Sequence, residues 1–324
     1  MKECFLYHLL IILLLLSPVA SASLHDRFSD RDKPTEPKPV SQVEIPTLPT
    51  DNDNNIEVGL FGVLESPLYK TVIEPDYKNI NTGEFQFRLS VGYGQVTNPL
   101  WARDDISAYV LPEFSYYSDK FYIENFVLGY SLFESQDLIL DVYGYINTDG
   151  YFFELDGIEN LTIASILDLR YNPRQQQTLV ERHLSYMSGL NAMYRINNFD
   201  LRMSYATDIS GVHNGQETIF EVSKLFVWEN LHFKIAADKT LKSDKINQYY
   251  YHSHADEPPF EIDESDIGAT DSNSLALQFG YKFSAHWSFN ALVKKTWLDD
   301  KLEKSIFVKE LDYLTTFVGI GYQF

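Results

Sequence analysis

Stretches of about ten residues in which every second side chain is apolar recur along most of this chain. In EFQFRLSVGYG (84–94), one parity holds phenylalanine, leucine, valine and tyrosine, while the other holds glutamine, arginine, serine and glycine. A period of two is the signature of a β-strand with one apolar and one polar face. About ten residues is also the length that a tilted strand needs to cross a bilayer. Eleven such strands are predicted, at 84–94, 106–117, 120–132, 138–147, 182–196, 199–208, 217–228, 231–239, 274–284, 287–298 and 313–324.

The connections between these strands alternate in length. Short turns at one end and longer loops at the other are typical of outer-membrane barrels. We therefore predict an all-β fold, a transmembrane antiparallel up-and-down β-barrel of about 12 strands over residues 84–324, closed by a C-terminal strand ending in Phe324. A soluble double-sheet sandwich is the alternative. The tight turns fall at 118–119, 197–198, 229–230 and 284–285, and the long polar connections at 95–105, 148–181, 209–216, 240–273 and 299–311.

Eleven is an odd count, whereas barrels of this kind usually have an even number of strands with both ends on the periplasmic side. One strand is therefore hidden from the pattern. Two segments are candidates for it: IEVGLFGVL (56–64), which would open the barrel, and LTIASILDLR (161–170), which lies within the long middle loop. The sequence leaves this choice open.

The composition agrees with a strand surface that meets lipid and then water. Aromatic residues make up 15% of the chain, with 22 Tyr and 22 Phe, yet the mean hydropathy is −0.23. Tyrosine and other aromatic side chains are enriched where a membrane protein crosses the interface. No apolar run is long enough for a transmembrane helix. The formal charge of −20 excludes the basic footprint that a nucleic-acid partner requires.

The N-terminal region divides into two parts. Residues 1–22 have the features of a signal peptide: Lys2, an apolar run from Leu9 to Leu16, and a small-residue pattern that predicts cleavage after about Ala22. A membrane anchor is the alternative. The single cysteine, Cys4, lies within this segment. Residues 23–83 are polar and proline-rich, which predicts a periplasmic tether, with 56–64 as a first strand or a plug.

The chain closes on YLTTFVGIGYQF (313–324), whose two parities differ sharply. This ending resembles the terminal signal by which outer-membrane barrels are recognised for assembly. We expect the apolar parity to face lipid and the glycines to face the lumen. The residues assigned to the signal are Phe324, Tyr322, Ile320, Val318 and Gly321.

The polar parity of the strands carries several charges that we expect to face the lumen. Most of them are basic, so the interior is predicted to be more basic than the whole chain. A wide pore with such a lining would favour anions, while a barrel of about 12 strands could equally be crossed by salt bridges or plugged. The candidate lumen charges are Arg88, Arg195, Arg202, Lys234, Asp238, Lys282 and Lys294.

Two histidine patterns have spacings that could support chemistry. His183 and Ser185 lie two apart, but no orienting acid or oxyanion donor accompanies them, so two polar lumen residues near a strand end is the favoured interpretation. His252 and His254 precede many acids within 240–273, which we interpret as a mobile acidic surface loop, with cation association as a secondary idea. Tyrosines 249–251 are expected in an aromatic girdle. The sequence predicts no catalytic, metal or cofactor-binding residue, and no enzyme.

Several stretches resemble the MltA-interacting protein (MipA/OmpV-like) outer-membrane family. They are LPEFSYYSDKFYIENFVLGYSL, SYATDISGVHNG, DKINQYYYHSHADE, LALQFGYKFSAHWSFNALVKKTWLDDKLEKSIFV and the closing VGIGYQF. The resemblance covers about residue 84 to the end. It implies a scaffold in the outer-membrane lipid, with a murein lytic transglycosylase and a peptidoglycan synthase (penicillin-binding protein) as partners. A small-solute channel, leaning to anions, or a surface adhesion protein is the alternative.

Overall fold

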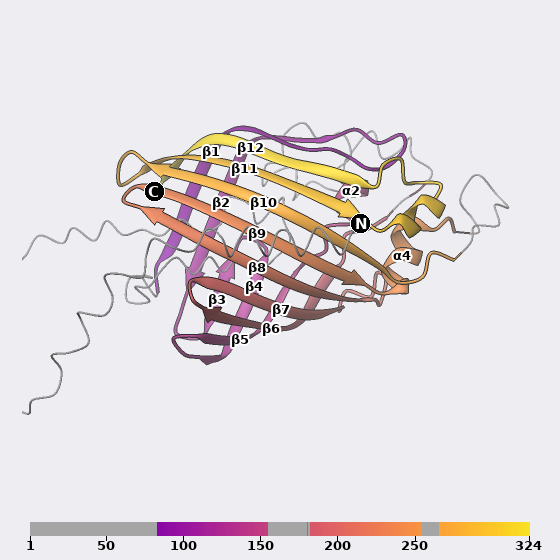
Figure 1. The fold of residues 1–324 in the computed structure, drawn as a ribbon, viewed down its shortest axis with the longest axis horizontal. Coiled ribbons are helices and arrows are strands. Elements are labelled where there is room, and N and C mark those ends of the chain that lie inside the picture. The colour runs from indigo at the N-terminus through magenta and orange to yellow at the C-terminus, as the bar shows by residue number, and fades with distance from the viewer. Residues whose placement is uncertain (1–82, 155–179, 181, 255–265) are drawn as a thin grey trace, which may run out of the picture. The chain divides into compact units, whose positions relative to one another are not determined.

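The computed structural model describes residues 83–154, 180, 182–254 and 266–324, which contain a closed β-barrel (Figure 1). Each strand pairs antiparallel with its sequence neighbours, and β1 closes the barrel against β12. The predicted signal peptide, the tether, and the segments 56–64 and 161–170 lie outside the described residues. The strands are β1 (Phe85–Val96), β2 (Ile106–Tyr117), β3 (Phe121–Glu124), β4 (Val127–Glu134), β5 (Leu138–Ile146), β6 (Tyr186–Ile196), β7 (Phe199–Asp208), β8 (Gln216–Trp228), β9 (Leu231–Lys242), β10 (Thr270–Lys282), β11 (Trp287–Leu298) and β12 (Asp312–Gln323).

The twelfth strand comes from the division of one predicted strand, 120–132, into two. Residues 120–132 divide at a turn, so that β3 and β4 form a short hairpin and the barrel closes with twelve strands without either proposed candidate. Asn125 makes this turn because it adopts a left-handed backbone conformation, with φ of 52°. Its backbone N–H donates to Phe114 O at 2.8 Å, and its side-chain Oδ1 accepts from Phe114 N at 2.9 Å.

The seam between the first and last strands is closely packed. The pairing runs from Arg88 opposite Gln323 to Val96 opposite Thr315. At its centre Gly92 lies opposite Gly319, and a Cβ at Gly92 would fall 2.1 Å from Val318 O. Only glycine therefore lets the two backbones approach this closely.

The outer surface of the barrel is apolar over most of its strands. Val318 and Ile320 on β12, for example, are each 46% exposed, while their neighbours on the opposite parity are buried or half-buried. Because the strands hydrogen-bond to one another around the barrel, such a surface can face hydrocarbon. The chain is thus a transmembrane β-barrel. Its large exposed apolar side chains include Val91, Tyr93, Leu128, Tyr130, Leu190, Tyr194, Met203, Tyr205, Phe220, Trp228, Leu277, Phe279, Tyr281, Trp287 and Val293.

The two ends of the barrel differ in their connections. At the end where the chain terminates, tight turns join the strands; Asn197 and Asn198 have φ of 48° and 64°, as a two-residue hairpin turn requires. At the other end, longer connections carry helix α2 (Tyr151–Glu154), helix α4 (Asp244–Tyr251) and the 3-10 helix η3 (Asp300–Lys304). By the usual asymmetry of such barrels, the first end is periplasmic and the second extracellular. None of the helices in the described part of the chain could span a membrane.

Candidate functional site

Buried ion pairs lie along the inner wall of the barrel. Glu221 on β8 lies between two cations from the flanking strands: Arg202 Nη1 is 3.8 Å from its Oε2, and Lys234 Nζ is 3.8 Å from its Oε1. All three side chains are less than 10% exposed. Because a buried charge is tolerated only with a partner, these residues form a fixed, ion-paired layer on the inner wall rather than a free lining.

Two further pairs extend this layer around the barrel. Arg88 Nη1 lies 3.5 Å from Glu113 Oε2, between β1 and β2. Lys294 Nζ lies 3.3 Å from Asp238 Oδ1, and the same oxygen accepts from the hydroxyl of Ser274. The paired side chains are all largely buried.

The inner wall carries acidic as well as basic side chains. The carboxylates buried inside the barrel include Glu113, Glu217 and Glu221, none of which is among the candidate lumen charges identified from the sequence. Arg195 pairs with Asp200 at 2.8 Å toward the periplasmic end, and Lys282 ends β10 there. The cations Arg88, Arg195, Arg202, Lys234 and Lys294 each lie beside a carboxylate, as does Lys242 higher in the barrel.

A second network closes the extracellular half of the lumen. Lys242 at the end of β9 donates to both carboxylate oxygens of Asp149, at 2.6 and 2.7 Å. Tyr251 on α4 donates to Asp149 Oδ1 at 2.7 Å. Burial, together with the Asp149 carboxylate, raises the pKa of Tyr251, so this phenol remains a protonated donor. Beside it, Tyr145 on β5 donates at 2.6 Å to Oε1 of Glu217, which lies opposite Lys242 in the β8–β9 ladder.

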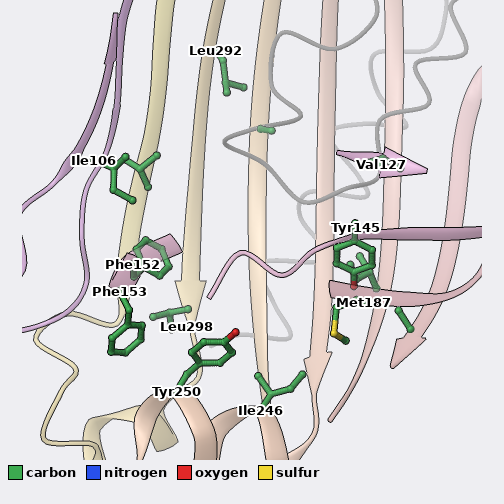
Figure 2. Packing of buried hydrophobic residues seen from close by; sticks show 14 of the residues in the cluster. Ile106, Val127, Tyr145, Phe152, Phe153, Met187, Ile246, Tyr250, Leu292 and Leu298 are labelled. Atoms are coloured by element: carbon green, nitrogen blue, oxygen red, sulfur yellow. The ribbon is translucent and has the colours of Figure 1, made fainter. Parts of the chain in front are cut away.

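An aromatic cap lies over this network. Figure 2 shows Phe152, Phe153, Leu298 and Tyr250 gathered at the extracellular end of the interior. The rings of Phe153 and Tyr250 stack with centroids 6.0 Å apart. The prediction that tyrosines 249–251 belong to an aromatic girdle was wrong for two of them, since Tyr250 and Tyr251 are buried. The amphipathic order of α4 turns these side chains inward, where each hydroxyl finds an acceptor.

Between the cap and the ion pairs lies a cavity of about 50 Å³. One side of it is formed by apolar and aromatic residues, among them Ile106 and Phe152. The other side carries Lys242 and Lys294, two carboxylates and several hydroxyl groups. At about 10–15 Å³ for each water, it can hold a few water molecules or a small polar group. The lining is Val96, Ile106, Thr148, Tyr151, Phe152, Glu217, Asp238, Thr240, Lys242, Ser272, Ser274, Lys294, Thr296, Tyr313 and Thr315.

A serine, a histidine and an aspartate lie together in the cap, in an arrangement that resembles a hydrolytic triad. Ser185 Oγ is 2.8 Å from His213 Nε2, and His213 Nδ1 is 3.9 Å from Asp208 Oδ2. However, Nδ1 accepts the backbone N–H of Gly215 at 2.9 Å, so the ring proton resides on Nε2 and points at Ser185. A general base for serine needs the opposite tautomer. In this geometry the histidine holds the cap together and cannot take a proton from Ser185.

The histidine expected beside Ser185 has a different role. His183 precedes β6, and its backbone N–H donates to the Tyr249 hydroxyl at 2.9 Å. Its carbonyl accepts from Tyr250 at 3.0 Å. The partner of Ser185 is instead His213, 28 residues further on, in the connection that follows β7. The Asp208 carboxylate accepts backbone N–H groups of the 209–215 connection.

Protonation of His213 is expected to loosen the cap at acid pH. Burial lowers the pKa of His213 against the opposing effect of Asp208 and Asp149, while Lys242 acts in the same direction as burial. A histidine that is neutral in the closed cap and titrates at about 6.5 when exposed contributes stability that is lost as pH falls below that value. Protonation of Nδ1 also breaks the hydrogen bond that this nitrogen accepts from Gly215 N–H. The other groups that face the ring, Tyr249, Tyr250 and Ser185, carry no negative charge that would offset this loss.

Hydrogen exchange at residues 209–215 measures this effect. After correction for the intrinsic pH dependence, we expect exchange at pH 5 to be faster than at pH 7.5 in the native protein, and the difference to disappear in His213→Phe. Equal corrected rates at the two pH values in the native protein would contradict the prediction.

The acidic connection between β9 and β10 is only partly described. Its first part forms α4 rather than an irregular loop, and residues 255–265 lie outside the described residues. His252 Nδ1 lies 2.9 Å from Ser253 O, and the ring of His254 contacts that of Tyr249. Among residues 83–154, 180, 182–254 and 266–324, no three His, Cys, Asp or Glu side chains are arranged to hold a metal ion.

The C-terminal residues assigned to the assembly signal lie at the periplasmic rim and on β12. Phe324 is 70% exposed, and its ring contacts those of Phe87 and Tyr322 at 5.4 and 4.9 Å. Val318 and Ile320 point outward. Gly321 lies on the opposite parity, where an added Cβ would meet Ser90 Oγ at 2.9 Å.

Comparison with known proteins identifies one family. The model of the family described as "MltA-interacting protein MipA" matches residues 89–324. No curated protein sequence matches this chain. Among solved structures, the chain is similar to a porin refined at 1.8 Å (9% identity, 74% of this chain and 100% of that one, TM-score 0.33). It is also similar to an outer membrane channel from Pseudomonas putida F1 (12%, 78% and 100%, 0.35) and to OprD from Pseudomonas aeruginosa (9%, 74% and 65%, 0.34). These weak similarities add nothing to the barrel seen directly.

Proposed function

Because this chain belongs to the MltA-interacting protein MipA family and is an outer-membrane barrel protein, we propose that it anchors peptidoglycan-remodelling enzymes to the outer membrane. In this proposal the barrel is a scaffold, and a murein lytic transglycosylase or a peptidoglycan synthase binds at its periplasmic end. The family description names an interaction with MltA, and this description supports the proposal for the present chain.

The observation that favours a scaffold is that the charges of the interior are buried and paired. Arg202, Glu221 and Lys234 form one buried group on the inner wall, Lys242 is held by Asp149, and Tyr250 is buried in the cap above them. An open pore would need those charges to face water with room for solute between them. The same observation disfavours the alternative of an anion-leaning channel, since the cations are paired with carboxylates.

The periplasmic rim offers a surface for such a partner. Asp119, Asp137 and Glu229 are exposed in three of its turns. Beside the first of these turns is a hollow of about 520 Å³. Exposed acids next to a hollow suit a partner with a basic patch, because complementary charge increases the rate and specificity of encounter. The hollow is lined by Gly83, Ser118, Asp119, Lys120, Phe121 and Tyr130.

A pull-down from a Gram-negative envelope tests the proposal. The tagged full-length protein, extracted in mild detergent, is expected to co-purify a murein hydrolase or synthase that mass spectrometry identifies. The triple variant Asp119→Lys, Asp137→Lys and Glu229→Lys should lose most of this enzyme, because the acids are the proposed contact.

The matched control reverses three exposed acids at the extracellular end: Asp244→Lys, Glu303→Lys and Glu310→Lys. It changes the net charge by the same amount and should retain the enzyme. Repeated absence of any envelope enzyme from the native pull-down would overturn the proposal. Equal loss of the enzyme in both triple variants would show that the acids of the periplasmic rim are not its binding surface.

A further inference from the structure

The barrel wall is interrupted beside β2. β3 has only four residues and pairs with β2 at Ser115, Tyr116 and Tyr117. One edge of β2 pairs with β1. Within the part of the chain that the structure describes, the opposite edge of β2 has no strand partner over 106–113. Every other neighbouring pair of full-length strands has a ladder along most of its length, so this break is local.

The break has a defined frame, which we call the window. Its lower edge is the Asn125–Phe126 turn, and its sides are β2 residues 106–113 and the extracellular end of β5. Its upper edge is the segment 147–154, which crosses from β5 to the connection between β1 and β2. Asn98 Nδ2 donates to Phe152 O at 3.0 Å and fixes this crossing. In Figure 2, Ile106 and Phe152 lie on one side of the view, and Val127 and Tyr145 on the other.

Among the described residues, the edge of β2 that β3 leaves uncovered has two features that disfavour pairing with a further strand. Asn125 satisfies both backbone groups of Phe114, where the β3–β4 hairpin stops. Pro112 lies two residues away, and alternate residues of a strand direct their backbone groups to the same edge. Proline removes the N–H that a further strand would use, and it is typical of edge strands that are not extended. A strand from another protein is therefore a poor occupant.

The window separates two different media. Outside it, Tyr109 is 42% exposed and its ring contacts Tyr93, which is 45% exposed on the lipid-facing side of β1. Inside it lies the cavity between the cap and the ion pairs, which Ile106, Thr148 and Phe152 of the frame line directly. Unpaired backbone groups at membrane depth are tolerated where they line a polar cavity. The window thus joins an apolar exterior to a polar interior.

We propose that the window admits the acyl chain of an amphiphile from the extracellular leaflet, with its head group directed to the lumen cavity. The apolar side chains of the frame, such as Ile106, Tyr109 and Phe152, suit the chain. The cavity lining carries two lysines, Lys242 and Lys294, and two carboxylates, Glu217 and Asp238, so its charges balance. A small head group without net charge fits such a lining better than an anionic or cationic one. The proposal is independent of any periplasmic partner.

Fluorescence quenching by chain-brominated lipid tests the window. In a Cys4→Ser background, bimane is attached to single cysteines at two inward-facing positions of β2, Ala108→Cys and Leu111→Cys, which are each 1% exposed. The matched controls are Ala206→Cys and Ile219→Cys, which are 0% and 2% exposed, face inward, and lie on strands paired on both sides. The proteins are reconstituted in phosphatidylcholine vesicles with or without mid-chain brominated phosphatidylcholine.

Bromine should quench the labels at 108 and 111 several-fold more strongly than those at 206 and 219, because only the β2 positions lie behind the window. Heat-modifiable migration on gels shows which labelled proteins are folded, and the two pairs allow for the loss of one variant. Equal quenching within both pairs would overturn the proposal. A disulfide-linked dimer of unlabelled Tyr109→Cys, at an outward-facing position of the same strand, would also overturn it, since a second copy of the chain would then occupy the edge.

Discussion

Deletion of Phe324 is expected to remove most of this protein from the outer membrane while leaving the stability of any finished barrel almost unchanged. The residue lies beyond the end of β12 and is 70% exposed. Its ring contacts with Phe87 and Tyr322 contribute about 0.5–1.5 kcal/mol each at most, and its backbone N–H adds one hydrogen bond to Phe87 O at 3.0 Å. The expected loss is therefore in recognition during assembly rather than in the folded state.

Two measurements separate these effects. The amount of heat-modifiable barrel in outer-membrane fractions should fall severely, whereas the urea midpoint of protein refolded into vesicles should change little. Phe283→Ala is a suitable control, because Phe283 is a similarly exposed aromatic residue (49%) in a turn at the same rim. Normal membrane levels of the truncated protein would refute the assigned signal.

Lys242→Met is expected to destabilise the barrel by about 3–5 kcal/mol, the range found when one partner of a buried ion pair is removed. The substitution leaves the Asp149 carboxylate, 3% exposed, with the Tyr251 hydroxyl but without its cation. It also removes a positive charge beside Glu217. Asp149→Asn in the same chain should recover part of the loss, because the uncompensated charge is then gone.

The same strand provides the control. Lys239 is three residues earlier on β9, points outward and pairs with Asp271 on β10, with side chains 41% and 32% exposed. Lys239→Met should cost only about 0–1 kcal/mol, as for other exposed pairs. Urea unfolding of the vesicle-reconstituted proteins, followed by tryptophan fluorescence, gives both values. Similar losses for the two lysines would contradict the difference in burial on which the prediction rests.

Much of the barrel is predictable from alternation alone. The segments 106–117, 199–208 and 287–298 were predicted with the bounds that the structure has, because one parity of each faces lipid and the other the interior. The β3–β4 hairpin was not predictable in this way. Asn125-Phe126 lacks a glycine or proline, and apolar residues continue on both sides of it, so the pattern reads as one strand.

The candidate site depends on contacts between distant residues, which periodicity does not encode. Lys242 and Asp149 are 93 residues apart, and Ser185 and His213 are 28 apart. Alternation indicates that a charged side chain points inward, but it does not identify the oppositely charged side chain that pairs with it. Tyr250 illustrates the same limit: an aromatic residue near the barrel end can serve a girdle or a cap, and only the path of α4 decides between them.

The seam between β1 and β12 also constrains the order of events as the barrel forms. Arg88 Nε donates to Gln323 Oε1 at 3.2 Å across 235 residues of sequence, while the other strand pairs join neighbours in the chain. Local hairpins can therefore form early, but closure waits for the last strand to be delivered, since long-range pairing is entropically slow. A ribosome that stalls before residue 312 would release a sheet with two open edges, which the envelope must degrade or shield.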